Sequence, residues 1–308
     1  PPRAEDIEAL SFTLTGATAP PAPPETEPTW YDHALPEERR SHLARLSEVF
    51  NQAADTLRAA GTLGHVYIPW RPPLPEAIPL VSPDRPVLAH NAALFLGVQD
   101  IPEHQTYADR YHDFDNGNLH IFGGGSSGKT SALRSLALAT SVDSAANNWS
   151  VYVLDFAGLQ LGALEELASV GSVLGESDVD RVIRLITWLA EEIQLRVSAQ
   201  SARGATSFEG LNDLLGHQRL PRILLMVDGF DSFYGFLDAQ HRQGEYVGMF
   251  RRICQEGRAA GVHVVLTSTR SNEGDGPTRS AMSTHLVMSG PPALLMDHGV
   301  KADVLPED

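Results

Sequence analysis

The chain has 308 residues, 42% of them hydrophobic, and a net charge of −16 from 23 basic and 39 acidic side chains. This length allows one large domain with a smaller segment, and the acidic balance disfavours nucleic acid or an anionic membrane as a partner. A single cysteine, Cys254, excludes an internal disulfide framework and is typical of a reducing compartment. No apolar run reaches the roughly 20 residues of a membrane span. Because the chain begins with Pro1, we expect a piece of a longer protein.

Residues 1–86 are expected to form a linker and a helical N-terminal segment. Prolines gather between residues 20 and 28 and indicate an extended stretch. Residues 36–60 carry apolar side chains at helical spacing and predict an amphipathic helix that stops near Gly61. A short strand over 65–68 and a proline-rich crossing loop over 69–86 follow. The apolar positions of the helix are Leu43, Leu46, Phe50, Ala53 and Leu57.

From residue 87 onward, apolar strands alternate with helices. Expected strands cover 94–98, 118–122, 151–155, 223–228 and 262–267, and expected helices cover 131–138, 178–199 and 245–260. Fully apolar strands that alternate with helices indicate a parallel sheet covered on both faces. Ser177 and Asp180 resemble a capping box at the start of the 178–199 helix.

The segment between the 118–122 strand and the 131–138 helix matches G-x-x-x-x-G-K-[ST], the phosphate-binding P-loop. Glycines let backbone N–H groups turn toward phosphate oxygens, Lys129 supplies a cation for the β- and γ-phosphates, and the Thr130 hydroxyl can ligate Mg²⁺. A strand–loop–helix unit also points a helix N-terminus at the phosphates. The expected nucleotide-binding residues are Gly123, Gly124, Gly125, Ser126, Ser127, Gly128, Lys129 and Thr130.

A P-loop site normally holds Mg²⁺ with an aspartate at the end of an apolar strand, the Walker B element. Asp228 ends the 223–228 strand and is the first candidate, while Asp155 ends the 151–155 strand and is its rival. Many hydrolysing P-loop enzymes have a glutamate directly after this aspartate, but here Gly229 follows, and Asp231 lies three residues past the strand. Loss of a general base lowers a rate by about 10²–10⁴-fold. We therefore expect nucleotide binding with slow hydrolysis or none.

Ring-forming ATPases often complete the site with an arginine from a neighbouring subunit, which offsets charge on the γ-phosphate. Arg181 and Arg184 lie on the polar side of the 178–199 helix, and Arg251, Arg252 and Arg258 are further candidates. For each single arginine, a solvated surface position is a better explanation than a role in a neighbouring site.

The same loop also matches a competing motif. Residues 124–128 fit G-x-S-x-G, the nucleophile turn of α/β-hydrolases, and Asp228 and His263 follow in the order of a hydrolase triad. This interpretation leaves Lys129 and Thr130 unexplained. The histidines form no H-E-x-x-H or Cys/His group, so no zinc site is expected.

The aromatic residues are explained most simply by packing. Trp70, Trp149 and Trp188 are expected to pack against apolar neighbours, and Cys254 to be a small buried residue. Tyr234 and Phe236 follow the 223–228 strand closely, so packing and contact with a base or a partner peptide both remain open for them.

Several segments together resemble the FtsK/SpoIIIE family of ATPases over about residues 60–308, and within it the EccC/EssC-type ATPases of type VII secretion systems. Residues 96–105 resemble G-x-x-D-x-P-x-x-Q, and residues 258–267 resemble R-x-x-G-[IV]-H. Residues 117–119 lead into the P-loop as in the family, residues 154–158 with 170–173 match the segment after its second strand, and residues 68–74 resemble its W-L-P-P-L linker. The combination of these segments is specific, whereas no single segment is.

The resemblance implies an α/β fold: a RecA-like P-loop NTPase core over residues 87–308, with a mostly parallel sheet and helices on both faces. Family members bind ATP and Mg²⁺, work in tandem or as a hexameric ring, and either drive secretion of small helical-hairpin proteins or translocate DNA. By the same resemblance, Asp228 is favoured as the Walker B residue that holds Mg²⁺ with Thr130, and Arg181 or Arg184 as the arginine finger.

Two positions depart from the family pattern. Gly229 stands where active members carry glutamate, and Thr269 stands where DNA-pumping members carry glutamine in L-A-T-Q-R-P. We therefore expect an ATP-binding module of a type VII-like protein-secretion motor with weak or absent hydrolysis. A DNA translocase module of the FtsK type is the alternative, which the net charge disfavours. The expected partners are neighbouring ATPase modules or subunits and a secreted protein or its signal peptide. We expect a cytoplasmic location, with membrane association only through other parts of the parent chain.

Overall fold

The computed structural model describes residues 37–59, 73–75, 77–82, 86–90, 92–142, 148–240, 244–271 and 276–300. Contacts between Cα atoms divide the chain into two units, Pro1–Arg71 and Pro72–Asp308. The boundary expected between residues 86 and 87 stays a prediction. The expected strand at 65–68, the linker over 1–35 and Trp70 lie outside the described residues.

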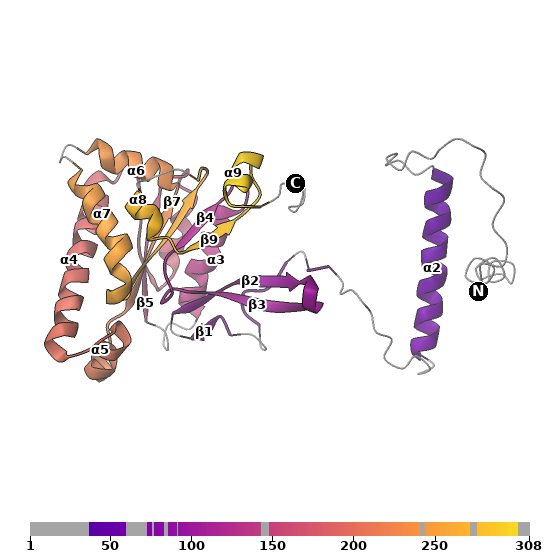
Figure 1. Ribbon diagram of the computed structural model, residues 1–308, viewed down its shortest axis with the longest axis horizontal. Helices are drawn as coiled ribbons and strands as arrows, with labels where there is room; N and C mark the ends of the chain where they lie inside the picture. The colour runs from indigo at the N-terminus through magenta and orange to yellow at the C-terminus, as the bar shows by residue number, and fades with distance from the viewer. Residues whose placement is uncertain are drawn as a thin grey trace. The chain divides into compact units, whose positions relative to one another are not determined.

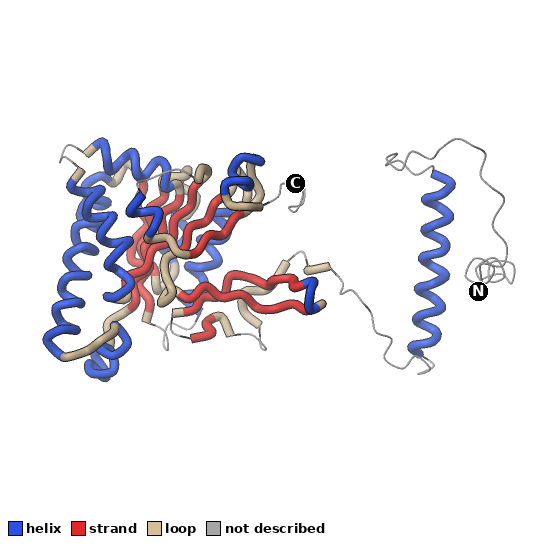
Figure 2. The backbone as a smooth tube through the Cα atoms, viewed as in Figure 1, coloured by secondary structure: helices blue, strands red, loops and turns tan. Residues whose placement is uncertain are grey.

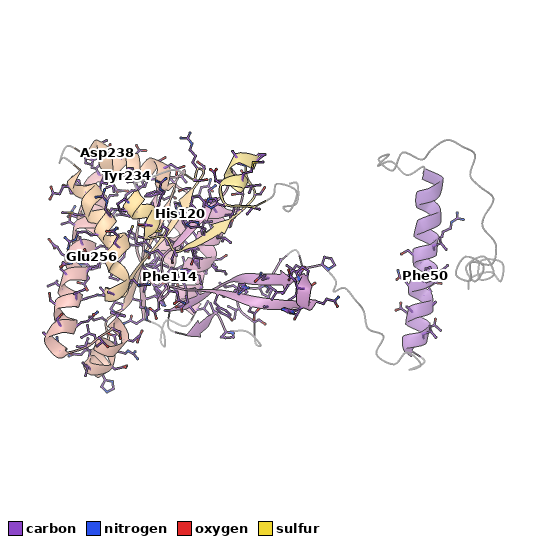
Figure 3. The ribbon with its side chains drawn as sticks, in the orientation of Figure 1. Phe50, Phe114, His120, Tyr234, Asp238 and Glu256 are labelled. Atoms are coloured by element: carbon purple, nitrogen blue, oxygen red, sulfur yellow. The ribbon has the colours of Figure 1, made fainter. Side chains whose placement is uncertain are left out.

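In the first unit, the expected helix is present as α2 (Glu37–Ala59). Two residues of its predicted apolar stripe, Phe50 and Leu57, are 57% and 44% exposed, and Figure 3 labels Phe50 on this helix. Among the described residues of both units, no helix is long and apolar enough to cross a membrane.

A six-stranded sheet forms the centre of the second unit, in the order β6-β5-β7-β8-β4-β9 (Figure 1). Its paired strands are parallel throughout, which confirms the expected parallel sheet. Because parallel strands end at one edge, the loop after β4 and the acids at the ends of β5 and β7 share that edge. The strands are β4 (Leu119–Phe122), β5 (Trp149–Asp155), β6 (Val170–Gly175), β7 (Arg222–Asp228), β8 (Val262–Ser268) and β9 (Thr284–Val287).

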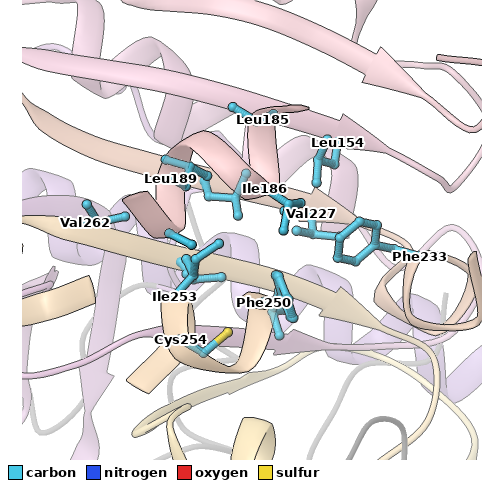
Figure 4. Close-up of a cluster of buried hydrophobic side chains, with 14 of the residues drawn as sticks. Leu154, Leu185, Ile186, Leu189, Val227, Phe233, Phe250, Ile253, Cys254 and Val262 are labelled. Carbon is cyan, nitrogen blue, oxygen red and sulfur yellow. The ribbon is translucent and has the colours of Figure 1, made fainter. Parts of the chain in front are cut away.

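Helices cover both faces of this sheet (Figure 2). Side chains alternate between the faces of a strand, so Ile223, Leu225 and Val227 of β7 pack in one cluster and Leu224 and Met226 in another. The first cluster includes side chains of α4 (Val179–Arg203), α6 (Phe230–Ala239) and α7 (Glu245–Glu256) (Figure 4). The second cluster includes side chains of α3 (Lys129–Val142).

A second, antiparallel sheet packs beside α3 in the order β1-β2-β3. Leu94 of β2 and Phe114, the residue after β3, are fully buried in the cluster that contains Leu119 and Leu133. The sequence predicted only residues 94–98 of this sheet, which belong to β2. It did not predict β3, because β3 is polar along most of its length. The strands are β1 (Leu88–His90), β2 (Ala93–Ile101) and β3 (Thr106–Asp113).

Shorter elements connect these layers. The short α-helices are α5 (Phe208–Leu215), α8 (Gly276–Ser280) and α9 (Pro292–Asp297), and the 3₁₀ turns are η1 (Pro102–His104), η2 (Gly162–Glu166), η3 (Gly216–Gln218) and η4 (Gly257–Ala260).

The capping box predicted for α4 is wrong. The N-cap residue is Asp178, and it makes no side-chain capping bond. Its carboxylate turns back instead, where Oδ2 accepts from the Gly175 N–H at 3.1 Å and Oδ1 accepts from Arg181 at 3.4 Å. The acid therefore fastens the end of β6, and Ser177 stays exposed.

A buried histidine lies in the strand that leads into the P-loop (Figure 3). His120 of β4 is 2% exposed, and its Nε2 lies 2.7 Å from the Ser268 hydroxyl at the end of β8. Burial, together with the nearby His285 and His298, lowers the pKa of His120 to about 3. The ring is therefore neutral in the folded chain at neutral pH.

We predict that this histidine makes folding sensitive to acid. In the unfolded chain the imidazole titrates near its ordinary pKa of 6.5, so protons favour the unfolded state from that pH down to about 3. Each pH unit in this window costs about 1.4 kcal/mol of unfolding free energy. Denaturant unfolding between pH 6.5 and 4 measures the slope, which should become smaller in His120→Gln. An equal slope in the two proteins would contradict the assignment.

Candidate functional site

A cleft of about 330 Å³ opens at the carboxyl edge of the parallel sheet. It brings together the P-loop, the start of α3, the loop after β5 and the ends of β7 and β8. Its lining residues are Gly125, Ser126, Ser127, Gly128, Lys129, Thr130, Ser131, Arg134, Ala157, Gln160, Asp228, Gly229, Thr267, Ser268 and Thr269.

Backbone hydrogen bonds hold the start of the P-loop. The Gly123 N–H donates to the Ser268 carbonyl at 3.1 Å, and the Gly124 N–H donates to the Ser289 carbonyl at 2.8 Å. At the other end, Gly128 has φ of +93°, a conformation that L side chains rarely adopt. The chain thus turns sharply into α3, whose first residue is Lys129, and the helix N-terminus faces the cleft.

Lys129 lies folded over the loop. Its Nζ donates to the carbonyl of Gly123 at 2.9 Å and also to the carbonyl of Gly124. Burial lowers the pKa of Lys129, while the charges of Asp228 and Asp231 oppose this shift. An anion entering the cleft would compete with the two carbonyls for the ammonium group.

Thr130 and Asp228 meet across the cleft, from α3 and β7. The Thr130 hydroxyl donates to Asp228 Oδ2 at 2.8 Å, and the carboxylate is almost fully buried. Because the hydroxyl proton points at the carboxylate, the lone pairs of Thr130 Oγ1 stay available to a cation. Mg²⁺ prefers oxygen ligands and usually combines few protein groups with water and phosphate, so this pair fits a Mg²⁺-bound triphosphate. Ser127 Oγ, buried and without a partner among the described residues, is a further polar atom in the same loop.

Asp155, the rival acid, has a different environment. Its Oδ1 accepts from the N–H groups of Ala157 and Leu159 at 3.3 and 3.1 Å, and its Oδ2 accepts from the Leu161 N–H at 2.8 Å. The carboxylate therefore organises the turn after β5, and it does not line the cleft.

The arginine-finger candidates do not line this cleft. Arg181 and Arg184 lie in the first turns of α4, after the edge strand β6, and β5, β7 and β8 separate that strand from β4. Arg181 pairs with Asp178, and Arg184 donates to the Asp180 carbonyl at 3.3 Å. Their expected role in a neighbouring subunit stays a prediction.

The other three arginine candidates also lie away from the cleft. Arg252 pairs with Glu256 on α7, and Arg258 donates to the Asn116 carbonyl at 3.4 Å. Arg251 belongs to the same helix, α7.

The distance between His263 and Ser126 excludes the α/β-hydrolase interpretation. His263 lies near the start of β8, four residues or about 13 Å before Thr267. It is fully buried, and Arg222 donates to its Nε2 at 3.1 Å. A histidine at the amino end of the strand cannot activate Ser126 at the carboxyl end.

Packing accounts for the aromatic candidates that the structure describes. Trp149 is buried beside Phe114, and Trp188 makes an edge contact with Tyr152. Tyr234 contacts Phe230 and Phe236 contacts Phe156, so both belong to the apolar cluster around α6. Cys254 is a free, buried thiol, as expected.

The sequence analysis assigned no site role to several lining residues, among them Arg134, Gln160 and Thr267. Arg134 follows Thr130 by one helical turn, a spacing that could have identified it, and its guanidinium donates to the Gln160 carbonyl at 2.7 Å. Gln160 belongs to the loop after β5, which no motif links to the P-loop. Thr267 is fully buried next to Asp228, and only the pairing of β7 with β8 reveals that proximity.

Comparison with known proteins assigns the family. The FtsK/SpoIIIE family model matches residues 91–273. The ESX secretion system protein EccC of Geobacillus thermodenitrificans is 24% identical over 220 residues, which cover 71% of this chain and 14% of that protein. The type VII secretion system protein EssC of Staphylococcus aureus (strain NCTC 8325 / PS 47) is 25% identical over 228 residues, or 71% of this chain and 15% of that protein. The chain thus spans about a seventh of these relatives.

Two solved structures have the same fold as this chain. EssC ATPases 2 and 3 from Geobacillus thermodenitrificans superimpose with a TM-score of 0.61 at 23% identity, over 74% of this chain and 42% of that chain. Thermomonospora curvata EccC ATPases 2 and 3, solved with a signal sequence peptide, give 0.63 at 24% identity, over 71% and 40%. Together, the matched model, the parallel sheet and the P-loop cleft place this chain in the FtsK/SpoIIIE family.

Proposed function

We propose that the chain is an ATP-binding module of a type VII-like protein-secretion motor. The observation that carries the proposal is the cleft in which the P-loop, Lys129 and the Thr130–Asp228 pair converge. In this proposal, P-loop amides and Lys129 bind the phosphates, and Thr130 and Asp228 hold Mg²⁺. The EccC and EssC relatives support the link to secretion.

The proposed partners follow from the same relatives. Two solved relatives carry two ATPases in one chain, and one of them was solved with a signal sequence peptide. We infer that this module works beside another ATPase module and responds to a secreted substrate or its signal peptide. Arg181 or Arg184 would then offset γ-phosphate charge in the site of a neighbour.

Slow or absent hydrolysis is part of the proposal, and packing around Gly229 supports it. Gly229 has φ of +79°, and a Cβ added there would lie 2.9 Å from the carbonyl carbon and oxygen of Phe156. Phe156 is the first residue of a segment that we name the strap, residues 156–161. Three N–H groups of the strap donate to the Asp155 carboxylate, and the Phe156 N–H donates to the Asp228 carbonyl at 2.8 Å, so the strap is fixed in place. A glutamate therefore has no room at position 229 unless the strap moves.

Nucleotide binding is tested by calorimetric titration of the whole chain with Mg·ATP. We expect one site, and we expect Lys129→Ala to weaken binding by at least about ten-fold, since the ion pair with phosphate is a charge-assisted contact of about 1.5–3 kcal/mol. Arg252→Ala removes an exposed cation of α7 and should leave the affinity unchanged. Equal affinity of the Lys129→Ala and unsubstituted chains would reject the proposed site.

The roles of the two acids can be separated by amide substitutions. Asp228→Asn should weaken Mg·ATP binding, because a neutral amide is a poorer partner for Mg²⁺ and its water. Asp155→Asn should leave that affinity nearly unchanged but lower the unfolding free energy by about 1–3 kcal/mol, because buried amides lose a charged acceptor. Titration and denaturant unfolding of both variants check this pattern, and the reverse pattern would make Asp155 the metal-site acid.

The position of the strap predicts that a glutamate introduced at position 229 lowers stability and does not restore ATP turnover. Gly229→Glu and Gly229→Ala should both lower the unfolding free energy by about 1–3 kcal/mol, because both force a side chain into a left-handed, crowded position. Neither variant should gain steady-state ATP turnover. Gly235→Ala is the matched control, since nothing lies within 4 Å of a Cβ there. A Gly229→Glu protein with unchanged stability and new turnover would show that the strap leaves room.

A further inference from the structure

Thr267 contacts both Asp228 and Gly229, although it belongs to neither the P-loop nor the Walker B motif. The residue lies on β8, next to β7, and its side chain is fully buried. Its hydroxyl accepts from the Gly229 N–H at 2.9 Å and donates to Asp228 Oδ1 at 2.6 Å. Thr267 therefore links the metal-site acid to the residue that follows it.

The directions of these hydrogen bonds are determined. A hydroxyl has one proton and two lone pairs. The Gly229 N–H can only donate, so it uses a lone pair of Thr267, and the Thr267 proton goes to Asp228. Asp228 then accepts one hydroxyl on each oxygen, from Thr267 on Oδ1 and from Thr130 on Oδ2. The rotation of the carboxylate is thereby fixed from both sides.

This arrangement has a consequence for Thr130. With Oδ1 engaged by Thr267, Oδ2 is the oxygen that receives the Thr130 proton, and the Thr130 lone pairs remain open to the cleft. Without the Thr267 hydroxyl, Oδ1 and the Gly229 N–H would both lose a partner in a buried place. The carboxylate could then turn and draw the Thr130 hydroxyl with it.

We propose that Thr267 is a positioning residue for Mg²⁺-dependent nucleotide binding. It holds the Asp228 carboxylate in the orientation that presents Thr130 Oγ1 to the cation. The proposal rests on the ATP-binding function proposed above. Residues that orient the ligands of a metal typically change its affinity by about 10–100-fold when they are replaced.

A purely structural role makes a different prediction. If the hydroxyl only satisfies buried polar groups, its removal lowers stability but leaves the gain in ATP affinity that Mg²⁺ provides. The measurement is therefore the ratio of ATP affinity with Mg²⁺ to ATP affinity with EDTA, obtained by calorimetry on the whole chain. We call this ratio the Mg²⁺ gain. Unfolding is measured on the same samples.

Thr267→Val keeps the shape and removes the hydroxyl. We expect the Mg²⁺ gain to fall by about ten-fold, while metal-free ATP affinity stays unchanged. Thr267→Ser keeps the hydroxyl and should keep most of the gain. Thr140→Val is the matched control, because it removes another buried hydroxyl, one that bonds the Ala137 carbonyl and Ser169 away from the cleft. This control should lower stability and leave the Mg²⁺ gain unchanged.

The outcomes separate the possibilities. An unchanged Mg²⁺ gain in Thr267→Val, or an equal loss in a folded Thr267→Ser, would overturn the proposal. If Thr267→Val does not fold, Thr267→Cys carries the test, since a thiol has similar size but is a weaker donor, and an undiminished gain there overturns the proposal too. If the unsubstituted chain shows no Lys129-dependent ATP binding, the proposed function itself fails, and this inference fails with it.

Discussion

Two threonine hydroxyls on one buried carboxylate organise the functional edge of this protein. Thr130 from α3 and Thr267 from β8 both donate to Asp228 at the end of β7. This interaction joins three elements that are far apart in the sequence, and it requires that β4, β8 and β7 end together. The parallel pairing of these strands, with apolar residues on both faces, provides that alignment. The large clusters on either side of the sheet thus support a small polar site at its edge.

In the proposed function, the strap is the feature that accounts for nucleotide binding without hydrolysis. Its backbone occupies the space into which a side chain at position 229 would extend, and three of its N–H groups donate to the Asp155 carboxylate. Phe156 packs against Phe233 on the α6 side, whereas Leu161 is buried on the α3 side. The strap is therefore anchored in both apolar clusters. The cleft thus contains Lys129 and the Thr130–Asp228 pair, while the strap leaves no room for a side chain at position 229.

The resemblance to type VII secretion ATPases gives these features a setting. Relatives of this chain are several times longer, and two solved relatives contain two ATPases in tandem. Under the proposed function, nucleotide that is bound but not hydrolysed would stabilise the contact with a neighbouring module. The net charge of −16 is more consistent with a protein partner than with a nucleic acid.

The sequence alone determined the alternation of apolar strands and helices, the P-loop and the family resemblance, because these depend on local spacing and composition. It also located α4 and the strands β5, β7 and β8 closely, since each is strongly apolar or periodic. It ranked Asp228 ahead of Asp155 but left the rival open, because both acids end apolar strands and their hydrogen-bond partners depend on the order of the strands in the sheet. It missed β3, most of whose residues are polar, and the presence of Arg134 and Gln160 in the lining of the cleft. Only the tertiary structure brought Thr267 to Asp228 and the strap to Gly229, because these contacts arise from strand order and backbone packing, which leave no pattern in the sequence.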